Sequence, residues 1–349
     1  MKVLLAMSGG VDSSVAGALL LEQGHDVVGV TMKLWGGESD SGCCSVGDVD
    51  DARRVAQQLG IDHLVFNFGE DFERHVVAPY VEAHANGVTP NPCVECNRHL
   101  KFDRLLRRGD QLGFDAVATG HHARVRRSID GRFTLERGAD AAKDQSYVVH
   151  MLDQAALSRT MFPVGDIDKA QVRRLANERG LRTASKPDSQ DVCFITSSAG
   201  RETFLGNRIE FRPGRVVDSR GTAVGEVAAL EMVTIGQRRG IGLPGGGPKR
   251  YVLDVDMPAG VVTVGDEEQL LRTTMRVEHV GWTDAPVSGP VRVQCSAHGA
   301  TATATATLAG GDSVQVTWDA PQRRVAPGQS VVFYDAADRV VLGGGIAAR

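Results

Sequence analysis

The residues best placed to do chemistry follow a short apolar segment at the start of the sequence. Val3-Leu4-Leu5-Ala6-Met7 leads directly into Ser8-Gly9-Gly10-Val11-Asp12-Ser13-Ser14. Glycines permit a tight turn and a close backbone approach, serine hydroxyls can donate to phosphate oxygens, and the first turn of a following helix directs its N–H groups at an anion. The segment contains no lysine, which separates it from the GxxxxGK[ST] loop. We therefore expect a phosphate-binding turn in which Asp12 orients Mg²⁺ or the loop itself.

Two cysteine-bearing motifs lie far apart in the sequence. Pro90-Asn91-Pro92-Cys93-Val94-Glu95-Cys96-Asn97 is rich in turn residues, and its two prolines restrict the backbone that carries both thiols. Lys186-Pro187-Asp188-Ser189-Gln190-Asp191-Val192-Cys193-Phe194-Ile195 is a polar, turn-like run that carries one thiol. A lone cysteine is more often a buried side chain. Beside a loop that activates a substrate, however, a thiolate or persulfide would supply the strong nucleophile that the activated substrate needs.

The spacing of apolar residues predicts the elements that must hold these motifs. Strands alternate with helices through the first half of the chain, which predicts a doubly wound parallel sheet with ligands bound beyond the carboxyl ends of its strands. Ser8-Gly9-Gly10, Met32 and Gly120-His121 all follow predicted strands. The predicted strands are 2–7, 27–32, 63–68 and 115–119, and the predicted helices are 15–23, one capped by Asp48 that ends at Gly60, about 71–85, about 100–111, and 169–179, with a turn-rich loop at 87–97.

The composition of the sequence changes beyond Cys193, where helical patterns become rare and glycine, proline and valine become frequent. Residues 301–307 alternate threonine with alanine, which is the period of a half-buried strand. We therefore expect an α/β fold in three parts: the doubly wound sheet in residues 1–197, a small β-rich central domain in residues 198–273 and a C-terminal β-barrel in residues 274–349.

Size and charge narrow the classes of protein and of partner. A chain of 349 residues is long enough for two or three domains. Its net charge of −4 means that a nucleic-acid partner would have to be held by a local basic patch. No stretch approaches the roughly 20 apolar residues of a membrane helix, so we expect a cytoplasmic protein. The six cysteines are too few and too unevenly placed for a disulfide scaffold.

A series of motifs carries a family resemblance. SGGVDSS resembles the signature of the PP-loop ATP pyrophosphatases, which cut ATP between its α and β phosphates and transfer AMP to a substrate oxygen. TPNPCVECNRHLKF, ATGHHARV, KDQSY, KPDSQDVCFI and TIGQRRGIG then follow in order. With all of them in place, the sequence from Met1 to about Asp256 resembles the tRNA-specific 2-thiouridylase family, and the C-terminal barrel is only weakly marked.

The resemblance implies a sulfurtransferase that works in two halves. The oxygen at position 2 of the wobble uridine of certain tRNAs attacks the ATP α-phosphate, and pyrophosphate leaves. Cys193 matches the cysteine that carries a persulfide, and Cys96 matches the nucleophile that helps to release this sulfur, which leaves a Cys96–Cys193 disulfide for a reductant. ATP and Mg²⁺ are the implied cofactors. The implied partners are tRNAs of the Lys, Glu and Gln type and, as sulfur donor, a cysteine desulfurase or a sulfur-relay protein.

The resemblance also assigns binding residues by position. Lys143, Asp144 and Gln145 match a tRNA-contacting segment, although a polar helix start is the alternative. Asn91, Pro92 and Cys93 match the loop beside the target base, which is extruded at little cost because it is already single-stranded. The ATP contacts match Ala6, Met7, Ser8, Gly9, Gly10, Val11, Asp12, Ser13, Met32 and Gly120.

Cys93 departs from the family pattern, because many members carry aspartate there. Cys93, Cys96 and Cys193 could form a three-thiolate set that holds an iron–sulfur cluster, which makes an iron–sulfur-dependent tRNA thiolase the alternative. Cys93 could equally be a spare thiol beside a persulfide route. Of the remaining cysteines, Cys43 and Cys44 are interpreted as exposed thiols rather than a sulfur relay, and Cys295 as a packed side chain.

Other interpretations stay open at this point. A PP-loop ligase of a small substrate would not need Cys96 and Cys193, and an RNA-binding module with a non-catalytic nucleotide site would not need the intact loop. His121-His122 lacks a third metal ligand at a sensible spacing, so packing or ATP contact is favoured. Gln237-Arg238-Arg239 could contact an RNA backbone or form a solvated charge run.

Overall fold

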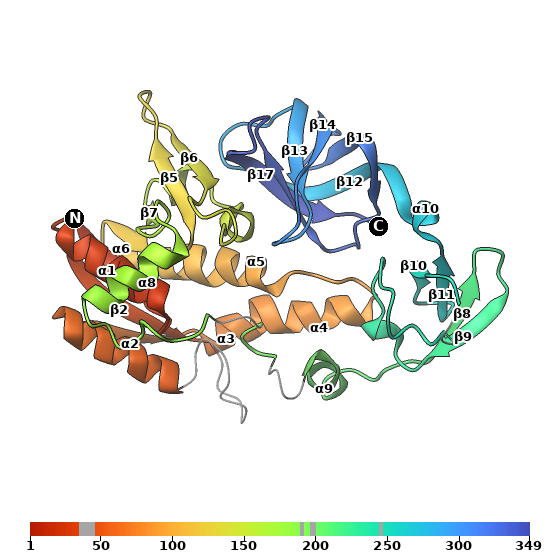
Figure 1. The fold of residues 1–349 in the computed structure, drawn as a ribbon, viewed down its shortest axis with the longest axis horizontal. Coiled ribbons are helices and arrows are strands. Elements are labelled where there is room, and N and C mark those ends of the chain that lie inside the picture. The colour runs from red at the N-terminus through yellow and green to blue at the C-terminus, as the bar shows by residue number, and fades with distance from the viewer. Residues whose placement is uncertain (35–45, 189–191, 196–199, 244–246) are drawn as a thin grey trace.

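The computed structural model describes residues 1–34, 46–188, 192–195, 200–243 and 247–349, and its arrangement is shown in Figure 1. The first sheet is parallel throughout, with the strand order β3-β2-β1-β4-β7. Its strands are β1 (Lys2–Ala6), β2 (Asp26–Lys33), β3 (His63–Asn67), β4 (Ala116–Ala118) and β7 (Thr160–Met161). The order reverses between β1 and β4, so the carboxyl ends of these two strands form the crevice where such sheets bind ligands.

Helices cover both faces of this sheet, as a doubly wound fold requires. Successive residues of β1 point to opposite faces. Val3 and Leu5 pack among apolar residues of α1, α2 and α8, whereas Leu4 packs among those of η1, α4, η2 and α6. The helical segments are α1 (Val11–Glu22), α2 (Val46–Leu59), α3 (Gly69–Phe72), η1 (Glu73–Val77), α4 (Ala78–Ala85), α5 (Pro92–Cys96), η2 (Asn97–Arg104), α6 (Leu105–Gln111), η3 (Ser146–Val149), α7 (Gln154–Leu157), α8 (Lys169–Glu178) and α9 (Gly200–Gly206).

Residues 92–97, predicted above as part of a turn-rich loop, are helical instead. Asn91 Oδ1 accepts hydrogen bonds from the N–H groups of Cys93 at 3.1 Å and Val94 at 3.4 Å, which makes Asn91 the N-cap of α5. Pro92 takes the first helical position, where its missing N–H and fixed φ suit the helix. The chain then runs through the π-helical η2 into α6. The same prolines and asparagine that suggest a loop are therefore a helix start.

The β-rich part of the chain forms two further sheets. The central sheet has the order β10-β11-β8-β9, and the C-terminal sheet closes into a six-strand barrel because β12 pairs with both β15 and β17. The central segments are β8 (Gly214–Asp218), β9 (Ala223–Val227), η4 (Leu230–Met232), β10 (Tyr251–Asp256), β11 (Val261–Gly265) and α10 (Glu267–Leu270). The barrel strands are β12 (Leu271–Trp282), β13 (Gly289–Gln294), β14 (Ala302–Leu308), β15 (Val314–Arg323), β16 (Ser330–Tyr334) and β17 (Val340–Ala347).

A hairpin from the first half of the chain extends the barrel sheet. β5 (Ala123–Arg127) pairs with β6 (Phe133–Arg137), and β6 in turn pairs with β17. Arg137 strengthens this joint, because its guanidinium lies 3.8 Å from the Tyr334 ring centroid and donates to Asp338 at 2.9 Å. The barrel is therefore attached to the first domain by strand pairing as well as by side chains. Within the described residues, no helix is long and apolar enough to cross a membrane.

Candidate active site

The loop between β1 and α1 is held by its own serines and glycines. Ser13 Oγ and Ser14 Oγ donate to the Gly10 carbonyl oxygen at 3.1 and 2.8 Å, and the Ser8 N–H donates to Ser13 Oγ at 3.3 Å. Gly9 has φ of +71°, and a side chain there would overlap the Asp48 carbonyl group. Ser14 is fully buried and also accepts a hydrogen bond from Thr183 Oγ1 at 2.9 Å. Its hydroxyl therefore binds within the protein and fixes the loop, and the phosphate-donating role expected from sequence stays a prediction for this serine.

The other residues assigned to ATP gather around this loop at the crevice between β1 and β4. Ala6 and Met7 lie at the end of β1, and Met32 lies near the end of the adjacent β2. Gly120 follows β4 so closely to the loop that a Cβ atom there would lie 2.7 Å from the Ser13 backbone nitrogen. The parallel register of the strands thus brings together segments that are about 110 residues apart.

A cluster of charged side chains that sequence reasoning missed surrounds Asp12. Lys169 Nζ donates to both Asp12 carboxylate oxygens at 2.7 Å, and His122 Nε2 donates to Oδ1 at 3.1 Å. Burial alone would raise the pKa of Asp12, but the hydrogen bonds from His122 and Lys169 outweigh it and lower this pKa. Asp12 therefore stays an anion at the entrance of the loop, paired with a cation from α8.

Asp188 extends the cluster toward the segment that leads to Cys193. Its carboxylate accepts hydrogen bonds from Lys143 Nζ at 2.8 Å and from Arg173 at 2.8 Å, and it pairs with Lys169 Nζ at 2.8 Å. Burial opposes the charged form, but the hydrogen bonds from Lys143 and Lys169 lower the pKa of Asp188 to about 2. The sequence contains no local signal for these pairs, because their members come from separate elements.

The segment Lys143-Asp144-Gln145, which the resemblance assigns to tRNA contact, is tied into the protein at each residue. Lys143 pairs with Asp188, as above. Asp144 is nearly buried and accepts hydrogen bonds from Arg137 at 2.6 Å and from the Ser146 hydroxyl at 2.8 Å. Gln145 is exposed, and its Oε1 accepts the N–H of His122 at 2.9 Å. Asp144 therefore supports the joint with the barrel, and Gln145 supports the histidine that contacts Asp12.

The two cysteines assigned to catalysis pack against one apolar cluster. Cys96, the last residue of α5, is 8% exposed, and Cys193 is half-buried at the margin of the same cluster. Phe194 anchors the Cys193 segment, since its ring lies 5.4 Å from Tyr80 and 5.0 Å from Phe204 between ring centroids. Packing around Phe194 thus holds the two thiol-bearing segments on one core.

The remaining sulfur and histidine assignments are placed as follows. Cys93 is exposed, and within the described ranges no group of three or more His, Cys, Asp or Glu side chains is arranged to hold a metal ion. The three-cysteine iron–sulfur site is therefore not favoured. Cys295 is half-buried, and burial raises the pKa of its thiol to about 12, as suits a packed side chain. His121 is buried against Phe102 and Phe162, whereas Cys43 and Cys44 lie outside the described residues.

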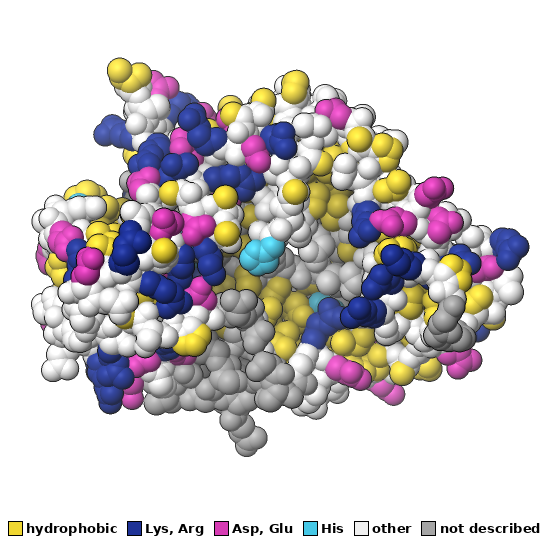
Figure 2. All heavy atoms as spheres, in the orientation of Figure 1, with side chains coloured by type: hydrophobic (Ala, Val, Ile, Leu, Met, Phe, Trp, Pro, Cys, Tyr) yellow, Lys and Arg dark blue, Asp and Glu magenta, His cyan; other side chains and the backbone are white. Residues whose placement is uncertain are grey.

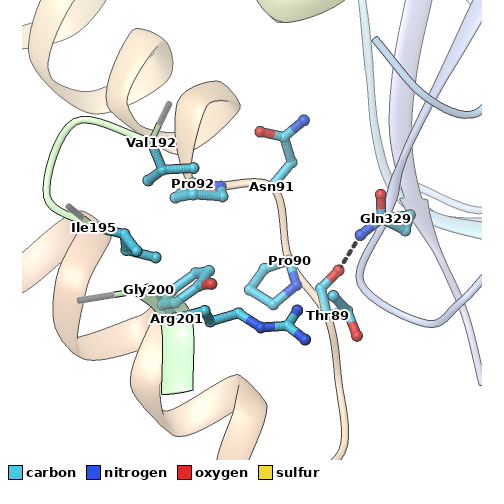
Figure 3. A pocket seen from close by; sticks show the side chains of 10 residues that line it. Thr89, Pro90, Asn91, Pro92, Val192, Ile195, Gly200, Arg201 and Gln329 are labelled. Carbon is cyan, nitrogen blue, oxygen red and sulfur yellow. Dashed lines mark hydrogen bonds between the residues drawn. The ribbon is translucent and has the colours of Figure 1, made fainter. Parts of the chain in front are cut away.

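A cavity of about 440 Å³ lies beside both cysteine segments. Figure 3 shows Asn91 and Pro92 on one side of it, Val192 and Ile195 on another, and Gln329 of the barrel reaching the Thr89 carbonyl. The described residues that line it are Tyr80, Thr89, Pro90, Asn91, Pro92, Val192, Ile195, Gly200, Arg201 and Gln329. Arg201, which sequence reasoning did not single out, is the charged residue of this lining, and it extends along the cavity toward Pro90 (Figure 3).

Basic side chains gather around the hollow on this face of the molecule despite the net negative charge. Figure 2 shows lysine and arginine side chains on both sides of the hollow between the sheet-bearing domain and the β-rich half. In the central domain Arg238, Arg239, Lys249 and Arg250 line a second cavity of about 390 Å³. The local basic patch that a nucleic-acid partner would require is therefore present.

Comparisons with known proteins agree with this architecture. Residues 1–197 match a family model described as the tRNA methyl transferase HUP domain, residues 202–266 its PRC-barrel domain, and residues 272–347 an aminomethyltransferase β-barrel domain. A crystal structure of a 4-thiouridine synthetase–RNA complex with bound ATP is similar over 55% of this chain and 44% of that chain, at 20% identity and a TM-score of 0.38. A likeness at that level carries no argument.

Full-length relatives settle the family. The tRNA-specific 2-thiouridylase MnmA of Roseiflexus castenholzii is 46% identical, over 100% of this chain and 99% of its own length. The protein of the same name from Chloroflexus aurantiacus is 47% identical, over 99% of this chain and 98% of its own. The chain therefore belongs to the tRNA-specific 2-thiouridylase family.

Proposed function

We propose that this chain is a tRNA-uridine 2-sulfurtransferase, which uses ATP to activate the position-2 oxygen of the wobble uridine and replaces it with sulfur. One observation carries the proposal: the cavity beside α5 is lined by residues from both of the segments that carry Cys96 and Cys193. Val192 and Ile195 bracket Cys193, and Pro92 begins the helix that ends at Cys96. A cavity of about 440 Å³ is in the size range of small-molecule sites and suits a single extruded base.

In the first half of the proposed reaction, the loop between β1 and α1 holds ATP. The N–H groups at the start of α1 and the dipole of that helix face the phosphates. Position 2 of the uridine attacks the α-phosphate, pyrophosphate departs, and AMP remains on the oxygen. Mg²⁺ bound to phosphates commonly takes only one or two carboxylates from a protein, and Asp12 can supply one. The metal would neutralise phosphate charge during this step.

In the second half, sulfur replaces the activated oxygen. A persulfide on Cys193 is attacked at its inner sulfur by the Cys96 thiolate, which forms a Cys96–Cys193 disulfide and releases hydrosulfide. Hydrosulfide adds to carbon 2 of the uridine, and AMP leaves with the original oxygen. The two cysteines are oxidised while the transferred sulfur is reduced, so an external dithiol must return two electrons before the next cycle. A cysteine desulfurase or a sulfur-relay protein would load the persulfide.

The proposed tRNA contacts combine the cavity with the basic surface. Asn91 and Pro92 would border the base, with Cys93 next to them in the sequence, and Arg201 offers a cation to the carbonyl groups of the base or to a phosphate of the tRNA. Lys143 and Gln145 lie on the side of the Asp12 cluster, and Arg238 and Arg239 lie in the central domain. We propose tRNAs of the Lys, Glu and Gln type as substrates.

The proposal is tested by reconstitution with tRNA, ATP, Mg²⁺ and a cysteine desulfurase, followed by nucleoside analysis for 2-thiouridine. Cys193→Ser and Cys96→Ser should each abolish the product, while tRNA-dependent release of pyrophosphate continues in a single turnover because adenylation needs neither thiol. Cys295→Ala is the matched control, since this thiol stays protonated and should leave the yield of product unchanged. Wild-type product from Cys193→Ser would exclude the persulfide route.

A further inference from the structure

The nucleotide loop lacks the lysine that many phosphate-binding loops carry, but the fold delivers one from elsewhere. Lys169 is the first residue of α8, and its ammonium group lies 2.7 Å from both oxygens of Asp12, the second residue of α1. Its side chain is only 12% exposed, whereas the Asp12 side chain is 30% exposed. The nearly buried Lys169 ammonium therefore contacts the more exposed Asp12 carboxylate at the entrance of the loop.

Local structure and packing fix the position of this lysine. Asp168 caps α8 by accepting the N–H of Gln171 at 2.6 Å, and Gln171 Oε1 in turn accepts the Asp168 N–H at 3.1 Å. Val172 and Ala176 of α8 belong to the same buried cluster as Val11 and Val15 of α1. Because α8 packs alongside α1, its first residue is held next to the first turn of α1.

Lys169 belongs to a cluster of charged side chains beside the loop. Side-chain contacts join three cations, Lys169, Lys143 and Arg173, to two carboxylates, Asp12 and Asp188. The nearby carboxylate of Asp140 lies outside these side-chain contacts, and it accepts the backbone N–H groups of Ala142 and Lys169, which stabilise its negative charge. Within this cluster Lys169 is the lysine that contacts Asp12, at the loop where backbone N–H groups already favour negative charge.

We propose that Lys169 is the pyrophosphate-binding cation of this enzyme. When ATP enters, the Lys169 ammonium moves from Asp12 to oxygens of the β and γ phosphates, and it holds the pyrophosphate as the bond to the α-phosphate breaks. The flexible four-carbon stem of lysine permits this exchange of partners without movement of α8. The inference rests on the proposed function, because it assigns a residue to the leaving group of the adenylation step.

The test compares the binding of ATP with that of AMP by titration calorimetry, without tRNA. AMP keeps the base, the sugar and the α-phosphate but lacks the groups assigned to Lys169. Lys169→Met should weaken ATP binding by about ten- to hundredfold, the usual effect of losing charge-assisted hydrogen bonds, and leave AMP binding within about threefold of wild type. Lys169→Arg keeps the charge and should restore ATP binding to within about fivefold.

Repeating the Lys169→Met substitution in an Asp12→Asn variant distinguishes direct contact with phosphate from simple neutralisation of the Asp12 carboxylate. Asp12→Asn removes the carboxylate that Lys169 would otherwise neutralise. If the ammonium binds phosphate, adding Lys169→Met to Asp12→Asn still weakens ATP binding at least about tenfold. Arg173→Met is the matched control for loss of a cation from Asp188, because Arg173 binds Asp188 and the carbonyl oxygens of Ala184 and Lys186. It should leave ATP binding within about threefold of wild type.

Three results would each overturn the inference. One is ATP binding by Lys169→Met within about threefold of wild type. Another is an equal loss for AMP and ATP, and the third is the disappearance of the Lys169→Met effect in the Asp12→Asn background. Failure of the wild-type protein to bind ATP at all would instead contradict the proposed function, so the two failures are distinguishable.

Discussion

Gly120 offers a sharp test of how closely the nucleotide loop is packed. A Cβ atom at this position would lie 2.7 Å from the Ser13 nitrogen, 2.9 Å from the Asp12 carbonyl carbon and 3.0 Å from Asp12 Cβ. Ordinary contact begins at 3.4 Å, so Gly120→Ala must push the end of β4 away from the start of α1 by about 0.7 Å. Overpacking of this kind costs about 1–3 kcal/mol.

The displaced atoms are those proposed to hold the phosphates, so the change should reach function as well as stability. A misplacement approaching 1 Å can lower a rate by about a hundredfold, and we expect kcat/KM for ATP to fall about 10- to 100-fold in Gly120→Ala. The assay is tRNA thiolation at varied ATP concentration, with ATP affinity from calorimetry and the thermal midpoint measured on the same samples.

A second glycine supplies the control. Gly109 lies in α6, where an added Cβ would meet Val117 Cγ2 at 3.5 Å, an ordinary contact. Gly109→Ala should therefore leave ATP kinetics unchanged and raise stability by about 0.5–1 kcal/mol, the usual gain for alanine over glycine within a helix. Wild-type ATP affinity and kcat/KM in Gly120→Ala would refute the close approach of β4 to the loop.

The structure supports two further predictions. Arg137→Met should lower the free energy of unfolding by about 2–4 kcal/mol and expose the barrel to protease, because this side chain is only 20% exposed and its contacts with Asp144, Asp338 and the Tyr334 ring are lost. The control is Arg132→Met, which breaks an exposed ion pair with Asp284 and should cost less than about 1 kcal/mol. Equal losses in the two variants would contradict the effect expected from their difference in burial. Asp188→Asn should lower the free energy of unfolding at pH 7 by about 1–2 kcal/mol, after allowance for solvent screening, and should lower the thermal midpoint accordingly. Because the pKa of Asp188 is lowered from 3.8 to about 2, this contribution is present above pH 4 and is lost as the pH falls through 2. The gap between variant and wild type should therefore shrink to about half at pH 3, and an unchanged gap would exclude the ion pairs as its source.

The sequence alone determined the local features of this protein. The strand, glycine turn and helix of residues 2–22 are formed by neighbouring residues, so apolar periodicity and turn chemistry predict them. The alternating run at 301–307 is indeed a strand, with Ala304 and Ala306 buried in the barrel core. The error at residues 92–97 was also local, because proline and asparagine serve a turn and a helix start equally well.

Only the tertiary structure decided which distant side chains meet. Lys169 and Asp12 are 157 positions apart, and their contact depends on α8 packing beside α1. Gln329 of the barrel reaches the cavity beside Cys96 and Cys193 and donates to the Thr89 carbonyl, a contact between residues 240 positions apart. A charged residue carries no local periodic signal that names its partner, since the pairing is set by how whole elements pack. The sequence therefore indicates the loop and the thiols, and the packing of helices and sheets supplies the cation and the cavity that complete the site.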